Sequence, residues 1–597
     1  MDAAPPVAQG LSAALRVGGS TFPPEALQLL LPLLPLDARA RAACVCRAWR
    51  TAAAHPLLWQ ELSFERCVTR VTDAALASLC ARASVALRTL SLDADACWGV
   101  TPAGMVAALR DGGCFGLQRL DALNAQFATY PLHRRELIAQ EVQELAAACP
   151  MLQHAACAVQ CTVEDAAAAS TALSGPLKLT CLRGNSHVGL MQLSECLRRN
   201  VALASLELIT YGFLDEDLTH LAECLRYNIM LTSLAIMSCD MGVWGATQLA
   251  ECLRVNTTLT HLSLLENGIG AAGASQLAES LRVNTTLTSL NLEANSIGSV
   301  GATQLAQSLR VNTTLKTLHL GENDIGDEGA TQLSSCLRSN TTLTSLSLEC
   351  NGIGAEAAMQ LAERIRANAT LTNLNLRSSN FGDAGAAQLA EHLRVNPTLT
   401  SLDLTDNGIG VAGVTQLADS LHVNTTLKSL NLSYNQIGDE GAKQLVACMR
   451  VNTTLTSLEI YGDDIGAEGA VHLAECLRVN ATLTLLDLSE NGIGYAATAQ
   501  LAESLRVNAT LTSLNLSYVG FGAEGAAALA EGLRDNVTLI SLDLRGNSFG
   551  DAGAMQLATG LRANTTLASL DLSHTGIGDE GKRALCAAVP PQCTLRM

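Results

Sequence analysis

Leucine recurs with a period of 28 residues through the second half of the chain. The repeated positions are Leu259, Leu287, Leu315, Leu343, Leu371, Leu399, Leu427, Leu455, Leu483, Leu511, Leu539 and Leu567. Within one unit, Leu259, Leu262 and Leu264 are separated by polar residues, which predicts a short strand with one buried face. Leu277, Ala278 and Leu281 follow at helical spacing, so we expect a short helix that packs on the strand.

Two asparagines mark the connections in each unit. Asn267 lies in the turn after the strand, where its side chain is predicted to bond backbone groups of neighbouring turns. Asn284 follows the helix, and we predict that it ends the helix in the left-handed conformation that glycine or asparagine adopts. In another unit Asp327 and Glu328 open the helix, which suits the positive end of the helix dipole. Each unit is therefore predicted as strand, turn, helix, turn.

Units of this kind cannot bury an apolar face alone, so they must stack into a continuous array. The pattern resembles the leucine-rich repeats of the ribonuclease-inhibitor class, which also occur in receptors of the NOD-like type. The resemblance covers residues 177–597 and implies an α/β horseshoe solenoid, with a parallel sheet inside and helices outside. Residues 65–176 resemble degenerate leucine-rich repeats, with strands starting near Leu87, Leu117 and Met151.

The N-terminal segment differs from the repeats. Residues 1–20 are rich in Ala, Pro and Gly and are predicted to be a disordered leader. Residues 21–64 carry leucines at helical spacing after Pro23, and Trp49 falls in a second predicted helix. So short a segment with this much leucine and tryptophan cannot make a self-sufficient core, so a partner surface is expected.

The order of residues from Phe22 to Leu62 resembles an F-box, a small all-α module. In that family the module docks on the Skp-type adaptor of a cullin-based ubiquitin ligase. The resemblance implies adaptor contacts at Pro23, Leu27, Leu31, Leu34, Val45, Cys46 and Trp49. Pro32 departs from the family's first helix, because a proline within a helix removes a backbone hydrogen bond. The alternative is a small helical cap that covers the first repeat.

Charge and cysteine placement narrow the classes of partner. The net charge of −18 argues against nucleic acid and anionic membranes as partners and is compatible with a basic protein. The longest apolar run, Leu29–Leu36, is too short to span a membrane. No signal peptide is recognised, which favours the cytoplasm, with the nucleus as an alternative. Several cysteines share one helix position of the repeats, and we interpret them as small buried residues: Cys196, Cys224, Cys252, Cys336, Cys448 and Cys476.

No catalytic constellation is found in the sequence, which has no phosphate-binding loop and only scattered histidines. We therefore predict a non-enzymatic protein without cofactor or metal. The side chains between the inward leucines are predicted to face the concave side, where acidic residues and tyrosines suit a basic protein client. The predicted client-binding residues are Glu293, Glu322, Glu349, Asp403, Tyr434, Tyr461, Asp487 and Tyr518. The alternative is a face that is merely solvated.

These expectations combine into one leading hypothesis. The protein would be the substrate-recognition subunit of a cullin-type (SCF) ubiquitin ligase, with residues 21–64 on the adaptor and the repeats on a client. The alternative is a non-catalytic interaction scaffold or inhibitor, related to NOD-like receptors, in which the N-terminal helices form a cap.

Overall fold

Short parallel strands and helices alternate along the chain in the computed structural model. The structure describes residues 61–63, 73–83, 87, 89–91, 102–111, 113–115, 117, 119–122, 149, 154–161, 177–182, 194–195, 197–198, 203–209, 214–590 and 593–597. The chain divides into two units, Met1–Cys239 and Asp240–Met597. Each unit is described by itself.

The second unit contains the regular repeats. Its strands are β8 (His261–Ser263), β9 (Ser289–Asn291), β10 (Thr317–His319), β11 (Ser345–Ser347), β12 (Asn373–Asn375), β13 (Ser401–Asp403), β14 (Ser429–Asn431), β15 (Ser457–Glu459), β16 (Leu485–Asp487), β17 (Ser513–Asn515), β18 (Ser541–Asp543), β19 (Ser569–Asp571) and β20 (Thr594–Arg596). Its helices are α11 (Gly242–Leu253), α12 (Gly270–Leu281), α13 (Gly298–Leu309), α14 (Gly326–Leu337), α15 (Ala355–Ile365), α16 (Gly382–Leu393), α17 (Val411–Leu421), α18 (Gly438–Met449), α19 (Ala467–Leu477), α20 (Gly494–Leu505), α21 (Gly522–Asp535), α22 (Gly550–Leu561) and α23 (Asp579–Ala588).

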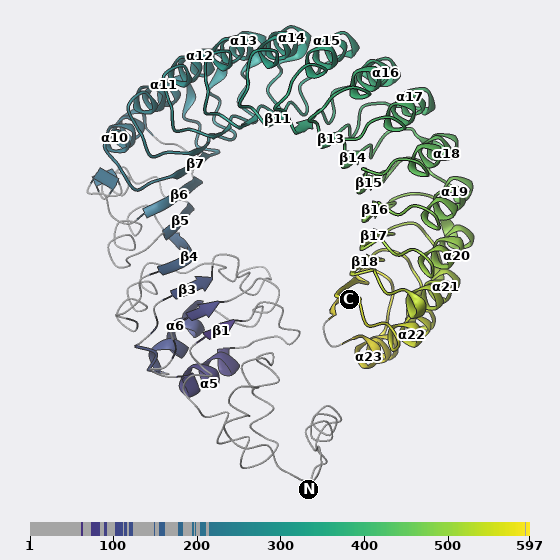
Figure 1. Cartoon of the computed structure of the whole chain (residues 1–597). Helices are drawn as coiled ribbons and strands as arrows, with labels where there is room; N and C mark the ends of the chain where they lie inside the picture. The colour runs from purple at the N-terminus through teal and green to yellow at the C-terminus, as the bar shows by residue number, and fades with distance from the viewer. Residues whose placement is uncertain are drawn as a thin grey trace, which may run out of the picture. The chain divides into compact units, whose positions relative to one another are not determined.

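The strands of this unit form one continuous parallel ladder. Each strand from β8 to β20 pairs with the next one along the chain, and equivalent leucines such as Leu262 and Leu290 lie in register. Figure 1 shows the strands along the inner side of the unit's arc and the helices along its outer side. The predicted α/β solenoid, with a parallel sheet inside and helices outside, is confirmed for this unit.

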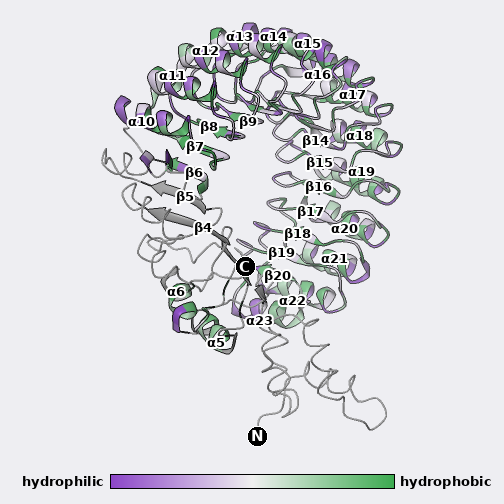
Figure 2. Cartoon of the chain, turned by 60° about the vertical axis from the view of Figure 1, so that its left-hand side comes forward, coloured by the Kyte–Doolittle hydropathy of each residue, from purple (hydrophilic) through white to green (hydrophobic). Residues whose placement is uncertain are grey.

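The leucines of both layers form the core between sheet and helices. Leu259, Leu262 and Leu264 from the strand segment are at most 4% exposed. Leu277 and Leu281 from α12 are equally buried and close the other side. Figure 2 shows hydrophobic and hydrophilic residues alternating around the outer helices, as expected for helices that bury one stripe. Each fully buried leucine contributes roughly 1.5–3 kcal/mol, and the pattern recurs in every repeat.

The asparagine in the turn after each strand joins consecutive repeats, as predicted. The Asn295 side-chain nitrogen donates to the carbonyl oxygens of Leu264, Leu292 and Glu293 at 2.7, 3.0 and 2.9 Å. Its side-chain oxygen accepts from the backbone nitrogen of Asn267 at 3.0 Å. Buried backbone groups without hydrogen-bond partners cost folding free energy. This residue supplies partners for groups that neither the strand nor the helix can reach. The position is filled by Ser379, Asp463, Val519 and Thr575 in four repeats.

The predicted role of Asn284 is wrong. Helix α12 ends through Arg282 in the right-handed conformation, and Asn284 is not among the described residues with positive φ. Instead, Asn284 is buried and its side-chain nitrogen donates to the carbonyl oxygen of Leu253 in the previous repeat at 2.7 Å. Its side-chain oxygen accepts from the backbone nitrogen of Leu287 at 2.8 Å. This asparagine therefore joins repeats and does not supply a left-handed helix end.

Acidic residues at helix starts add a third connection between repeats. Asp327 and Glu328 lie in the first turn of α14, as predicted. In α18, one carboxylate oxygen of Asp439 accepts from the backbone nitrogens of Gly466 and Gly469 in the next repeat, at 2.7 and 2.8 Å. Such an aspartate therefore caps the following helix as well as opening its own.

The first unit is described in pieces. Its elements are β1 (Glu61–Ser63), α5 (Asp73–Ala83), β2 (Thr89–Ser91), α6 (Pro102–Asp111), β3 (Arg119–Ala122), β4 (His154–Cys161), β5 (Leu177–Leu182), β6 (Leu203–Ile209), α10 (Asp215–Leu225) and β7 (Ser233–Met237). Strands β1 to β7 pair in parallel in chain order. Leu87 and Leu117 are buried just before β2 and β3, where strand starts were predicted.

The N-terminal predictions fall outside the described residues. This applies to the leader over residues 1–20 and to all seven predicted adaptor contacts between Pro23 and Trp49. Within the part of the chain that the structure describes, every helix is too short or too polar to cross a lipid bilayer.

Candidate protein-binding face

Each repeat of the second unit presents three side-chain positions on the inner side of its sheet. In the β9 repeat they are Asn291 at the end of the strand, Glu293 two residues further, and Ala294. Asn291 and Glu293 are half-buried, and Ala294 has a positive φ of 54° because the chain turns toward the helix there. We call these three positions, taken from β9 to β19, the inner face.

The structure distributes the eight predicted client-binding residues over the three positions. The strand position holds Asp403 and Asp487. The position two residues beyond the strand holds Glu293, Glu349 and Tyr461. The positive-φ position holds Glu322, Tyr434 and Tyr518. These last three lie one residue beyond the second position, in the turn where the backbone φ is positive.

Two of the predicted tyrosines pack against each other. The ring centroids of Tyr434 and Tyr461 lie 4.9 Å apart with an interplanar angle of 77°. The Tyr434 hydroxyl donates to the Glu490 carboxylate at 2.8 Å, and this bond, with burial, raises the pKa of Tyr434. A Cβ at Gly462 would lie 2.6 Å from the Tyr434 ring, so the ring rests directly on a glycine backbone. The pair is therefore held in place before any ligand arrives.

Three carboxylates lie at the strand position beside the tyrosine pair. Asp403, Glu459 and Asp487 belong to β13, β15 and β16 and share one register across the sheet. Burial raises the pKa of Glu459, and the charges of Asp487 and Asp403 raise it further. Among the described residues, none of the three carboxylates forms an ion pair.

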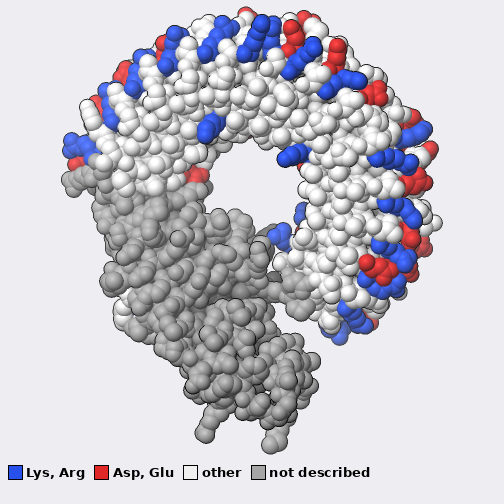
Figure 3. Space-filling model, viewed as in Figure 1, with Lys and Arg blue, Asp and Glu red and all other residues white. Residues whose placement is uncertain are grey.

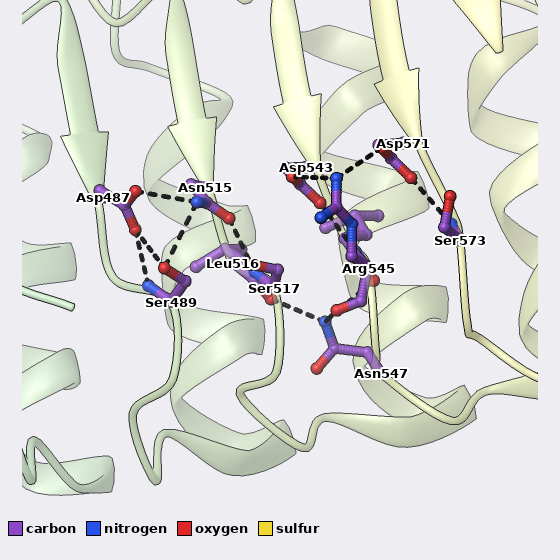
Figure 4. Close-up of polar contacts among 11 residues, drawn as sticks. Asp487, Ser489, Asn515, Leu516, Ser517, Asp543, Arg545, Asn547, Asp571 and Ser573 are labelled. Carbon is purple, nitrogen blue, oxygen red and sulfur yellow. Dashed lines mark hydrogen bonds and ion pairs between the residues drawn. The ribbon is translucent and has the colours of Figure 1, made fainter. Parts of the chain in front are cut away.

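Neutral neighbours fix the orientation of these carboxylates. Asp487 accepts from the Ser489 hydroxyl at 2.6 Å and from the Asn515 side-chain nitrogen at 2.8 Å (Figure 4). Asp403 accepts from the Thr405 hydroxyl at 2.6 Å in the same manner. These bonds orient the negative charges but do not neutralise them.

A second acidic pair lies over Gly321. A Cβ at this glycine would lie 2.7 Å from Cγ of Glu349 and 3.3 Å from Cγ of Glu293, so the two side chains meet where the glycine leaves space. Burial raises the pKa of Glu293, and the charges of Glu349 and Glu322 add to the effect. Asn375 donates to Glu349 at 2.7 Å.

The inner face changes character near β18 and β19. Arg545 lies between Asp543 and Asp571, at 3.8 and 3.0 Å from their carboxylate oxygens (Figure 4). Burial raises the pKa of Asp571, but the bonds from Ser573 and Arg545 outweigh it, so the pKa is lowered. Tyr518 adjoins this ion-paired group and does not join the Tyr434–Tyr461 pair.

Two acidic neighbours of the tyrosine pair, Glu459 and Glu490, are not among the eight predicted client contacts. Glu459 shares the strand position and the register of Asp487, and that register was a usable signal. Glu490 occupies the positive-φ position two repeats after Tyr434, and the sequence gives no sign that the two side chains bond. The two residues are 56 positions apart in the sequence, and the stacking of the repeats brings them together.

The helices carry charged side chains on the outside, and several of them carry a buried cysteine. Figure 3 shows Lys, Arg, Asp and Glu side chains of both signs along the outer helices. Cys224, Cys252, Cys336, Cys448 and Cys476 are buried, as predicted, and Cys196 lies outside the described residues. Burial raises the pKa of Cys336 and Cys448 to about 12. No group of His, Cys, Asp and Glu suited to a metal ion occurs among the residues with described positions.

Comparison with known proteins identifies both parts of the chain. Residues 20–65 match the F-box-like family. Eleven segments match the Leucine Rich repeat family, at residues 255–278, 283–306, 311–334, 339–362, 367–390, 395–418, 423–446, 479–496, 507–530, 535–558 and 563–586. The chain therefore joins an F-box-like domain to leucine-rich repeats, an organisation that suggests an F-box substrate-recognition protein. The narrower likeness to the ribonuclease-inhibitor class stays a prediction.

Two solved structures show a partial likeness to the chain at low sequence identity. An internalin from Listeria monocytogenes is 21% identical, covers 64% of this chain and 88% of its own, and has a TM-score of 0.35. The complex of Rad7 and Elc1 from yeast is 20% identical, covers 69% of this chain and 88% of its own, and has a TM-score of 0.39. No curated protein matches the chain.

Proposed function

We propose that the protein is the substrate-recognition subunit of a cullin-type (SCF) ubiquitin ligase. The F-box-like domain at residues 20–65 would bind a Skp-type adaptor, and the inner face would bind a protein client. The observation that supports this role is the presence of both modules in one chain. The chain itself contributes no catalytic group in this role. It holds the client close to the subunits that modify it, and proximity alone contributes substantially to rate.

Adaptor binding is the decisive measurement. The full chain and its Leu34→Ala/Trp49→Ala variant are titrated with a purified Skp-type adaptor by calorimetry. We expect tight binding by the wild type and its loss in the double variant, because both side chains are predicted adaptor contacts. Trp244→Ala is a matched control, since Trp244 lies on α11 and is 50% exposed. It should bind like the wild type.

The result separates the two functions that the sequence leaves open. Undiminished binding by the double variant would contradict the assigned adaptor contacts. Absence of binding by the wild type would contradict the ligase role. It would leave an interaction scaffold or inhibitor that uses the same inner face, with the N-terminal helices as a cap.

A further inference from the structure

Four carboxylates surround the tyrosine pair on the inner face. We call Asp403, Glu459, Asp487, Glu490 and the rings of Tyr434 and Tyr461 the tyrosine patch. Its residues come from the consecutive repeats of β13 to β16, so they form one continuous area. Tyr434 is 43% exposed, which leaves its ring available to a ligand.

The charges of the patch call for a cationic ligand. The structure shows no ion pair between any of the four carboxylates and a described lysine or arginine. Arg377 is near enough to lower the pKa of both tyrosines, against larger effects that raise them, yet it pairs with no patch carboxylate. At β18 and β19, by contrast, Arg545 already pairs with the local aspartates. The chain therefore supplies its own cation at β18 and β19, whereas no described cation pairs with the patch carboxylates.

We propose that the tyrosine patch binds an arginine side chain of the protein client. A guanidinium group stacks on a tyrosine ring and donates two parallel hydrogen bonds to a carboxylate, which an ammonium group cannot do. The patch offers both surfaces at once, an exposed ring and carboxylates whose orientation is already fixed by Ser489, Thr405 and Asn515. The inference rests on the proposed client-binding role of the inner face.

Fluorine NMR on the full chain tests this directly. The chain contains seven tyrosines, so 3-fluorotyrosine labelling gives a spectrum with few signals. The signals of Tyr434 and Tyr461 are assigned from Tyr→Phe variants. The probe is a glycine–serine peptide with one central arginine, and matched peptides carry citrulline or lysine there. We expect saturable shifts of the Tyr434 and Tyr461 signals with the arginine peptide and none with the citrulline peptide. Tyr495, which is 57% exposed on α20, serves as the internal reference.

Variants of the patch locate the binding. Glu459→Gln/Asp487→Asn should lower the affinity for the arginine peptide at least about tenfold, because two carboxylates lose their charge. Glu524→Gln/Glu531→Gln removes the same charge from exposed positions of α21 and should leave the affinity unchanged. Equal shifts with citrulline, equal affinity for lysine, or shifts of Tyr495 as large as those of the pair would each overturn the proposal.

Adaptor titration of the same samples separates this inference from the proposed function. Arginine binding without adaptor binding would keep the patch and remove the ligase role. Adaptor binding without any response at Tyr434 and Tyr461 would keep the ligase role and overturn the patch as the client's binding site.

Discussion

Asp463 is the one described acid in the asparagine column that joins the turns, and its replacement tests the physics of that column. One carboxylate oxygen accepts from the backbone nitrogen of Asn435 at 2.7 Å, while the other is buried without a partner. In the next repeat, the Asn491 side-chain nitrogen donates to the carbonyl oxygens of Ile460 and Leu488, at 2.8 and 3.0 Å. A carboxylate oxygen in that environment can donate only when it carries a proton.

The linkage between this proton and folding has a definite sign. Burial raises the pKa of Asp463 from 3.8 to about 8, and the bond from Asn435 offsets part of the rise. Between these two values the folded chain keeps a proton that the unfolded chain has lost. The free energy of unfolding therefore falls as pH rises, by roughly 1.4 kcal/mol per pH unit, and becomes level above pH 8. Over the whole window the loss is on the order of 5 kcal/mol.

Asp463→Asn should remove this pH dependence, because an amide side chain does not ionise and can donate at any pH, as Asn491 does in the next repeat. Urea unfolding followed by circular dichroism between pH 4 and 9 measures the effect. The variant should be several kcal/mol more stable than the wild type at pH 8 and nearly equal near pH 4. Asp464→Asn is the matched control, since Asp464 is the exposed neighbour, and it should keep the wild-type slope. An Asp463→Asn variant that is as pH-dependent as the wild type would refute the argument.

Substitutions at three further sites probe the contacts between repeats, each by urea unfolding against the wild type. Asn295→Ala leaves several buried backbone groups unpaired and should destabilise the unit by about 2–5 kcal/mol, whereas Asn295→Asp should introduce the pH dependence described for Asp463. Asp439→Ala removes a cap from two backbone nitrogens and should cost about 1–2 kcal/mol, and Asp439→Asn, which keeps the accepting oxygen, should cost less. Gly462→Ala places a Cβ against the Tyr434 ring at a position where φ is +65°, so it should cost about 1–2 kcal/mol and shift the Tyr434 fluorine signal. Gly492→Ala is the control and should leave that signal unchanged, because its Cβ would meet only a carbonyl oxygen at 3.9 Å.

The sequence predicted the repeat architecture because leucine spacing alone decides which face of each element is buried. The position of Asn267 also revealed its role, since a polar side chain in a tight turn must satisfy backbone groups. Asn284 was misjudged because helix-end preferences are local, whereas its partner Leu253 belongs to the previous repeat.

The inner face could be predicted only in part. Its acidic character is visible in composition, but the bond between Tyr434 and Glu490 depends on how far two side chains reach across the intervening repeat. The raised pKa of Asp463 was likewise hidden, because the sequence does not distinguish an aspartate in a solvated turn from one that is buried among the asparagines. The visible signal was its place in the asparagine register, where a buried charge lowers the free energy of unfolding.

The asparagine columns also determine how such an array can change in length. Asn284 and Asn295 each donate to a carbonyl oxygen of the previous repeat, 31 residues earlier in the sequence in both cases. Deleting or duplicating a 28-residue block between equivalent positions would therefore bring together ends that re-form the same bonds, whereas a partial block would leave them unmatched. The inner face can lengthen or shorten only in whole steps of about 4.8 Å, one strand at a time. The spacing between two binding patches on this fold can therefore change only by whole repeats, and inserting a repeat keeps every contact between neighbours.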